Sequence, residues 1–187
     1  MHRARFAAVA ALALALAACG GSSKPEGTSP KRWTAAVCQA LVDWRDGIQT
    51  KANELQKDAS SIKSLKEGRR LIVGLADDGV ELSDEMLRKV DAAGTPAVDD
   101  GAKIKRDFRA NLAKLRDVLV QAKDDAEKIP VDTPDHFASA SEKWGKDVFS
   151  HFESVSGTFD ELGKKYKSDE IENAAKSEPA CKDLSNS

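Results

Sequence analysis

Residues 104–129 read IKRDFRANLAKLRDVLVQAKDDAEKI, and the apolar residues in this stretch recur every three or four positions. They are Ile104, Phe108, Leu112, Leu115, Leu119, Ala122, Ala126 and Ile129. An α-helix turns once in 3.6 residues, so this spacing places them on one helix face and the charged residues on the other. Thr95-Pro96 predicts the start of this helix, and Pro130 predicts its end.

Three further segments have the same period. The first begins at Ser29-Pro30. Its apolar positions are Trp33, Val37, Leu41, Trp44, Ile48, Ala52 and Leu55. The second opens at Ser60 or Ser61 and is expected to bend at Gly79, because glycine weakens a helix interior. The third follows Thr133-Pro134 and ends near Lys167.

No segment alternates apolar and polar residues with the period of two that marks a β-strand. The connections between the four long segments are only a few residues long, which favours sequential antiparallel neighbours. We therefore predict an all-α fold, an antiparallel four-helix bundle of long helices. A short helical tail is expected at residues 168–176, ahead of a polar C-terminus.

The N-terminus has the layout of a signal peptide. Arg3 and Arg5 precede an uncharged apolar run over residues 6–18, which is shorter than the about 20 residues that a membrane-spanning helix needs. The run ends in Leu16-Ala17-Ala18-Cys19, which resembles the lipobox of bacterial lipoproteins. The alternative, an ordinary secretory peptide, is disfavoured because Ala17-Ala18-Cys19 is a poor cleavage site for one.

The resemblance implies cleavage before Cys19, diacylglycerol on its sulfur and a fatty acyl chain such as palmitate on its amine. Two or more chains anchor a protein stably. We therefore predict a signal peptide at 1–18, a flexible Gly/Ser tether at 19–29 and a helical bundle domain at 30–187, held on a membrane of the cell envelope and facing away from the cytoplasm. The alanine-rich signal run, the lipobox and residues 33–38, which read WTAAVC, also resemble, loosely, those of small lipoproteins of actinobacteria, and this resemblance implies no activity.

Cys38 and Cys181 remain once lipid occupies Cys19. Exported proteins retain disulfides, so we predict a bond between these two residues, with two buried free thiols as the alternative. A zinc site is disfavoured, since His136 and His151 are the histidines left after removal of the signal peptide.

Two groups of residues invite a chemical role. Asp147 and His151 lie one helical turn apart and suggest a metal or proton-transfer site, although an exposed pair beside the core is the simpler interpretation. Three aspartate pairs, at 77–78, 99–100 and 124–125, lack the ligand spacing of a calcium loop and are interpreted as solvated helix surfaces. We expect no cofactor, no metal and no catalytic residue.

The balance of 29 basic and 31 acidic residues gives no basic footprint for nucleic acid. The anchor, the tether and the bundle together favour a non-enzymatic, membrane-anchored interaction or structural module with an envelope protein as partner, which is the leading hypothesis. The alternative is a carrier for a small apolar ligand or lipid in the bundle core. Its lining would come from the aromatic residues Trp33, Trp44, Phe108, Phe137, Trp144, Phe152 and Phe159, which also suit plain core packing.

Overall fold

The computed structural model describes residues 26–185, apart from the side chains of Ser156 and Asp160. The predicted signal peptide, Cys19 and the tether up to residue 25 lie outside this range. Within it the protein is all helical, as predicted, with no β-strand in the described part of the chain. The helices are α1 (Pro30–Ala59), α2 (Leu65–Ala92), α3 (Gly101–Ala126), α4 (Pro134–Lys165), α5 (Asp169–Ser177) and α6 (Pro179–Ser185).

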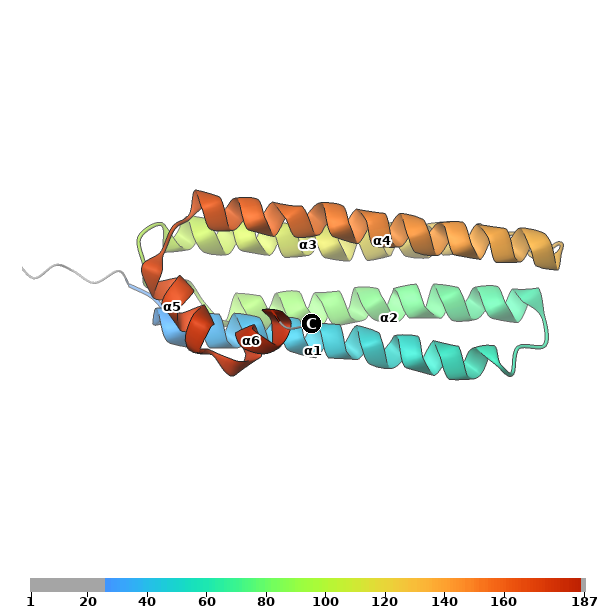
Figure 1. The fold of residues 1–187 in the computed structure, drawn as a ribbon, viewed down its shortest axis with the longest axis horizontal. Helices are drawn as coiled ribbons and strands as arrows, with labels where there is room; N and C mark the ends of the chain where they lie inside the picture. The colour runs from blue at the N-terminus through green and yellow to red at the C-terminus, as the bar shows by residue number, and fades with distance from the viewer. Residues whose placement is uncertain (1–25, 186–187) are drawn as a thin grey trace, which may run out of the picture.

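The four long helices lie with their axes nearly parallel (Figure 1). α3 and α4 form one side of the molecule, and α1 and α2 form the other. α2 packs against both α1 and α3, α4 packs against α3, and the short helices α5 and α6 pack against α1. We call the end at which α5 lies the proximal end and the opposite end, with the α1–α2 and α3–α4 loops, the distal end.

Ion pairs at seven-residue intervals join α2 to α3. They connect Asp77 with Lys123, Asp84 with Arg116, and Asp91 with Arg109. Seven residues are close to two helical turns, so the three pairs form one row along the edge of the contact. The partner numbers fall along α3 as they rise along α2, which means that these two helices run in opposite directions.

α2 is one helix through Gly79, where the sequence predicted a bend. A side-chain Cβ at this position would lie 3.0 Å from Leu119 of α3 and 3.4 Å from Ile48 of α1. Glycine therefore lets three helices approach closely here. One turn further along, Ser83 is fully buried and its hydroxyl accepts a hydrogen bond from the Trp44 indole at 2.9 Å.

α2 begins at Leu65, later than the start predicted at Ser60 or Ser61. The Ser64 hydroxyl accepts a hydrogen bond from the Glu67 amide at 3.3 Å, and the Glu67 carboxylate accepts one from the Lys63 amide at 2.9 Å. This is a variant of the capping box, in which a serine and a glutamate three residues later satisfy backbone donors at a helix start. The capping residue is therefore Ser64.

α3 also begins later than predicted, at Gly101 rather than at Thr95-Pro96. The Thr28 amide donates to the Thr95 carbonyl at 2.7 Å, and the Ala97 amide donates to the Thr28 carbonyl at 2.8 Å. This short bridge uses the backbone groups that would start a helix. Thr28, which the sequence placed in the flexible tether, is therefore held by the folded domain.

The buried core is concentrated towards the proximal end. Trp33 and Phe108 meet edge to face at 6.0 Å between ring centroids, and Phe108 meets Phe159 in the same way at 5.4 Å. Among the side chains that the structure describes, α1 has no buried residue after Ala40 and α4 has none before Val155. The predicted apolar faces of these two helices are therefore only partly used as core.

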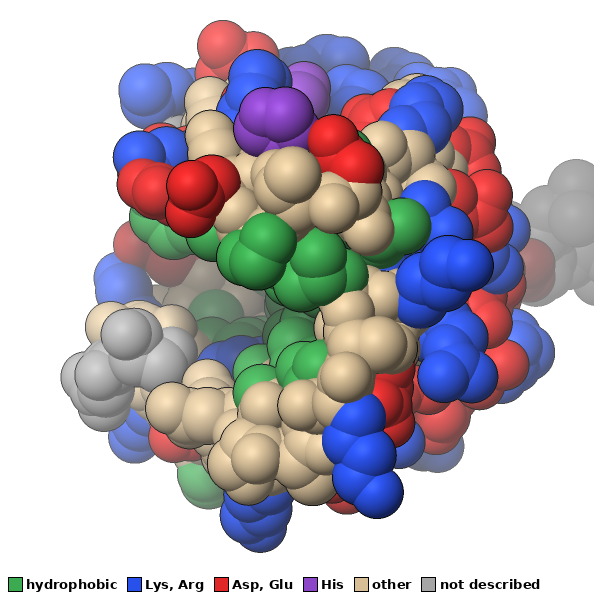
Figure 2. All heavy atoms as spheres, turned by 90° about the vertical axis from the view of Figure 1, so that its right-hand side faces the viewer, with side chains coloured by type: hydrophobic (Ala, Val, Ile, Leu, Met, Phe, Trp, Pro, Cys, Tyr) green, Lys and Arg blue, Asp and Glu red, His purple; other side chains and the backbone are tan. Residues whose placement is uncertain are grey.

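The distal halves of the same helices leave their apolar side chains half-buried or exposed. Figure 2 looks onto the distal end and shows hydrophobic side chains around a hollow between the two sides of the molecule. The physical reason is that α4 packs along α3 but has few contacts with α1. Trp44 of α1 and Phe152 of α4, whose ring centroids are 6.1 Å apart, make one of them.

The C-terminal end of α4 is fixed to α3 by Asp107. Its carboxylate accepts hydrogen bonds from the Lys165 ammonium at 2.8 Å and from the Tyr166 hydroxyl at 2.7 Å. These bonds, together with one from Arg106, hold the pKa of Asp107 well below its ordinary value of 3.8. α5 follows in the predicted place, and α6 lies where the sequence predicted only a polar C-terminus.

Candidate functional site

A groove of about 630 Å³ runs between the middle and distal parts of α3 and the facing part of α4. We call it the α3–α4 groove. Its apolar lining consists of Val118, Ala122, Ile129, Pro130, Ala140, Trp144, Val148 and Val155. Small-molecule sites commonly have volumes of roughly 300 to 1,000 Å³ and mostly apolar walls, so the groove has the size and character of a binding site.

Trp144 of α4 is the aromatic residue that lines this groove. Its indole N–H donates a hydrogen bond of 2.7 Å to the backbone carbonyl of Ala122, which ties α4 to α3. Ala122 is buried, whereas Trp144 keeps part of its ring exposed to the groove. An aromatic ring held in this way offers an apolar contact surface that loses little freedom when something binds to it.

The rim of the groove carries charges of both signs. Lys128 pairs with Asp125 at 2.8 Å, and the Gln121 amide donates to the same carboxylate at 3.0 Å. These bonds, with a smaller contribution from the charge of His151, lower the pKa of Asp125. On the other rim Lys143 pairs with Asp147. Each contact joins residues three or four positions apart on the same side of the groove, so none of them closes it.

The predicted pair of Asp147 and His151 lies on the rim of the groove. The His151 ring nitrogen Nδ1 is 2.7 Å from the backbone carbonyl of Asp147, while the Asp147 carboxylate pairs with Lys143. The two side chains therefore have separate partners. Across residues 26–185 there is no group of three or more His, Cys, Asp or Glu residues that could hold a metal ion.

At least one member of each aspartate pair forms an ion pair with a partly or largely exposed lysine, in agreement with the interpretation as helix surfaces. Asp78 lies 3.4 Å from Lys51, and Asp100 lies 2.7 Å from Lys103. The remaining histidine, His136, lies 2.9 Å from Asp132 beside the first turn of α4. These contacts are exposed and stabilise helix ends and neighbouring helices, and they bring no reactive groups together.

The aromatic residues of the predicted ligand cavity lie in several separate places, and Trp44 and Phe152 contact each other with 6.1 Å between ring centroids. Trp33, Phe108 and Phe159 contact one another at the proximal end, where their rings occupy the space between the helices. Phe137 instead lies over Gly68 of α2 at the distal end, and Trp144 lines the groove. Of the seven predicted residues, Trp144 is the one that lines the α3–α4 groove.

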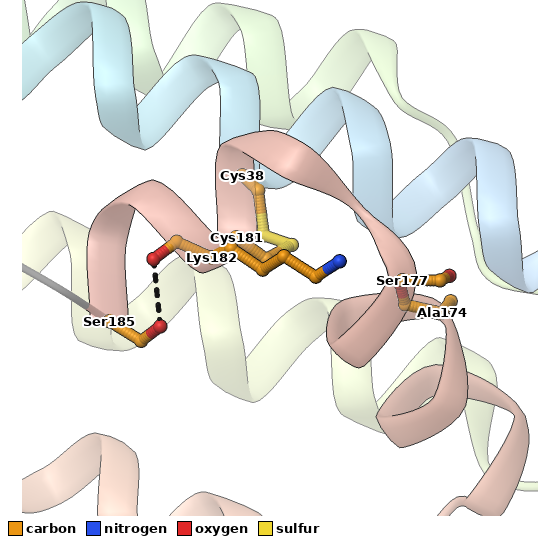
Figure 3. Close-up of a disulfide and its surroundings, with 6 residues drawn as sticks. All are labelled: Cys38, Ala174, Ser177, Cys181, Lys182 and Ser185. Carbon is orange, nitrogen blue, oxygen red and sulfur yellow. Dashed lines mark hydrogen bonds between the residues drawn. A yellow bond between two sulfur atoms is a disulfide. The ribbon is translucent and has the colours of Figure 1, made fainter.

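The structure brings Cys38 and Cys181 together. Their sulfur atoms are 2.01 Å apart and their Cα atoms 5.1 Å apart, and the bond joins α1 to α6 (Figure 3).

Cys19, the predicted lipidation site, lies outside the described residues. No helix within residues 26–185 is both long enough and apolar enough to cross a membrane.

Comparison of the chain with protein-family models, with curated proteins and with solved structures finds no significant match.

The α3–α4 groove itself was not predicted from the sequence. The available signal was Val118, an apolar residue beside the main face of its helix that the core pattern did not use.

Proposed function

We propose that the protein is a lipid-anchored, non-enzymatic interaction module of the cell envelope that binds a protein partner along the α3–α4 groove. The observation that carries the binding role is the groove, which combines an apolar floor, a fixed Trp144 ring and rim charges that pair on their own side of the groove. The motif Leu16-Ala17-Ala18-Cys19 supports the anchor, which would hold the domain outside the cytoplasm.

We further infer that α1 to α4 form one antiparallel four-helix bundle. Support comes from contacts whose residue numbers run in opposite directions along each neighbouring pair. In α3 and α4, Ala122 meets Trp144 and Asn111 meets the carbonyl of Thr158. In α1 and α2, Asp43 pairs with Lys89 and Lys51 pairs with Asp78. Such a bundle is a rigid scaffold that would present the groove on its side.

The non-enzymatic role rests on the chemistry of the groove. Four of its ionisable side chains, Asp125, Lys128, Lys143 and Asp147, pair with each other within three or four residues. Of the others, Lys114 donates to Asn111 and the His151 ring contacts the Asp147 carbonyl. A general base or nucleophile requires a partner set arranged around a reacting atom, and the two ion pairs lie on separate sides of the groove. The groove therefore favours binding over catalysis.

A carrier for a small apolar ligand is the second candidate. Its supporting observation is the volume of about 630 Å³, which suits a ligand of drug-like or fatty-acid size. The ligand would lie between α3 and α4 rather than within the aromatic cluster. Native mass spectrometry of the Cys19→Ser chain separates the candidates, because a carrier retains extra mass that organic solvent removes, whereas an interaction module has the mass of the chain alone.

The binding surface is tested by blocking the groove. Ala140 lines it and Ala138, two residues away, is exposed outside it, so Ala140→Arg and Ala138→Arg form a matched pair. Cells producing either variant are treated with a lysine-reactive crosslinker, and adducts are identified by mass spectrometry. Ala140→Arg should remove the partner adduct and Ala138→Arg should retain it. Equal adducts from both variants would refute the groove as the binding surface.

The anchor is tested separately with Cys19→Ser. The unmodified chain should enter the detergent phase on phase partition, and the variant should remain in the aqueous phase because it has no thiol to accept diacylglycerol. Equal partition of both proteins into detergent would contradict anchoring through Cys19.

A further inference from the structure

The last helix, α6, is attached to the domain in an unusual way. It has seven residues, and none of them is buried. Cys181 links it to Cys38 of α1, and the Asp183 carboxylate lies 2.6 Å from the Arg45 guanidinium of the same helix. Figure 3 shows the disulfide passing from α1 into the middle of α6. The hydrogen bond from the Ser185 hydroxyl to the Lys182 carbonyl, 2.8 Å long, stays within α6.

The neighbouring helix α5 is held differently. Ile171 packs against the hydrophobic core and Ala174 is buried, with 7% of its surface exposed. The Ser168 hydroxyl also caps the start of α5 by accepting a hydrogen bond from the Ile171 amide at 3.4 Å. α5 is therefore fixed by burial and by its own cap, both of which persist without the disulfide.

The ion pair is a weak hold for α6 by comparison. The Arg45 side chain is 29% exposed and that of Asp183 is 56% exposed, so water and salt screen the pair. A helix of seven residues is also too short to be stable by itself in water. Ala180 and Leu184 of α6 are half-buried against its neighbours, and the link between Cys38 and Cys181 adds a covalent restraint to these partly exposed contacts.

Both cysteines are half-buried rather than enclosed. A thiolate attacks a disulfide along the line of the sulfur–sulfur bond and needs access to one sulfur atom. Because both residues keep part of their surface exposed, the disulfide lies at the edge of the contact between α1 and α6 rather than inside the core.

We propose that the Cys38–Cys181 disulfide is a thiol-exchange site at which a dithiol reductant releases α6 from α1. One thiolate of the dithiol attacks a sulfur of the bond, and the other cysteine leaves as a thiolate and takes up a proton. The second thiol of the dithiol then resolves the mixed disulfide. The dithiol is oxidised to its own disulfide, and Cys38 and Cys181 are reduced to thiols.

The consequence is local. α6 detaches and uncovers the part of α1 between Cys38 and Arg45, while α5 stays on the core through Ile171 and Ala174. The released segment and the bared Cys38 thiol form a surface that exists only in the reduced protein. This inference requires the two cysteines and is independent of the α3–α4 groove.

The test uses the full chain carrying Cys19→Ser, treated with dithiothreitol in native buffer. Alkylation and intact mass report reduction, and hydrogen–deuterium exchange reports the order of each helix. We expect reduction to raise exchange of the α6 amides by at least about tenfold at the shortest labelling times, because an isolated turn of helix has little protection, while α1 to α5 stay folded and remain the more protected helices.

Two control variants separate the restraints. Asp183→Asn removes the ion pair and keeps the disulfide, so α6 should remain protected until dithiothreitol is added. Cys38→Ser with Cys181→Ser should show rapid α6 exchange from the outset and no response to the reductant. The proposal is overturned if α6 stays protected after complete reduction, if reduction occurs only in denaturant, or if exchange rises equally in all helices.

Discussion

Leu112 offers a sharp test of where the core lies. Its side chain has 0% of its surface exposed and belongs to the main hydrophobic cluster. Arg109, three residues before it, pairs with Asp91, and Arg116, four residues after it, pairs with Asp84. Both pairs connect α3 to α2, so the backbone on either side of Leu112 is held in place.

Replacing Leu112 with alanine removes three carbon atoms and leaves a cavity. Such changes cost about 2 to 5 kcal/mol in the free energy of unfolding, with the larger values where the surroundings do not collapse. Because Leu112 is fully enclosed in the main hydrophobic cluster, we expect Leu112→Ala to cost about 3 to 5 kcal/mol, in the upper part of that range.

The assay is urea unfolding of the Cys19→Ser chain, followed by circular dichroism at 222 nm. The midpoint should fall while the slope of free energy against urea stays constant, since the surface exposed on unfolding is unchanged. Phe149→Ala is the control, because Phe149 is 65% exposed and its loss should change stability by less than about 0.5 kcal/mol. A cost below about 1 kcal/mol for Leu112→Ala would refute this account of the core.

Three other outcomes follow from the same structure. Non-reducing peptide mapping should find Cys38 bonded to Cys181, and free thiols at both positions would contradict the pairing. Replacing both cysteines with serine should lower the free energy of unfolding by up to about 5 kcal/mol, because the bond closes a separation of 143 residues. The pKa of Asp107 is lowered chiefly by the bond from Lys165, so the ionised carboxylate stabilises the fold fully above the ordinary value of 3.8, and this stabilisation is lost as the pH falls through the lowered pKa. Between about pH 5 and pH 2.5 the urea midpoint of the wild type should therefore fall more than that of Asp107→Asn. An equal fall in both proteins would contradict this role of Asp107. Gly101→Ala should destabilise the protein by about 1 to 3 kcal/mol despite the higher helix propensity of alanine, because the new Cβ meets a backbone carbonyl of the preceding loop; equal or greater stability of the variant would show that the loop yields.

Much of the helical architecture was predictable because it depends on local chemistry. The start of α4 follows from Thr133-Pro134, and in the structure the Thr133 hydroxyl accepts a hydrogen bond from the His136 amide at 3.3 Å. The same dipeptide pattern failed at Thr95-Pro96, where the backbone pairs with Thr28 instead. A residue 67 positions away in the chain decided that outcome, and local patterns do not contain such contacts.

The candidate site was less predictable than the helices. Periodicity assigns Trp144 and Val148 to an apolar face but does not state how far apart two helices lie, and that distance creates the groove. The same limit explains why the distal apolar residues of α1 were expected to be buried and are half-exposed. The Cys38 and Cys181 pair was accessible from the sequence because it depended on counting cysteines in an exported protein rather than on geometry.

The most direct test of the proposed binding role is site-specific photocrosslinking in cells that produce the lipid-anchored chain. A photoreactive residue at Gln121 lies on the rim of the α3–α4 groove, whereas one at Gln56 lies on the exposed surface of α1 outside it. If a protein partner binds in the groove, the residue at Gln121 gives a discrete protein adduct that disappears when Ala140→Arg is added. The residue at Gln56 gives no matching adduct. The same adduct from both positions, or one from Gln56 only, would contradict binding in the groove.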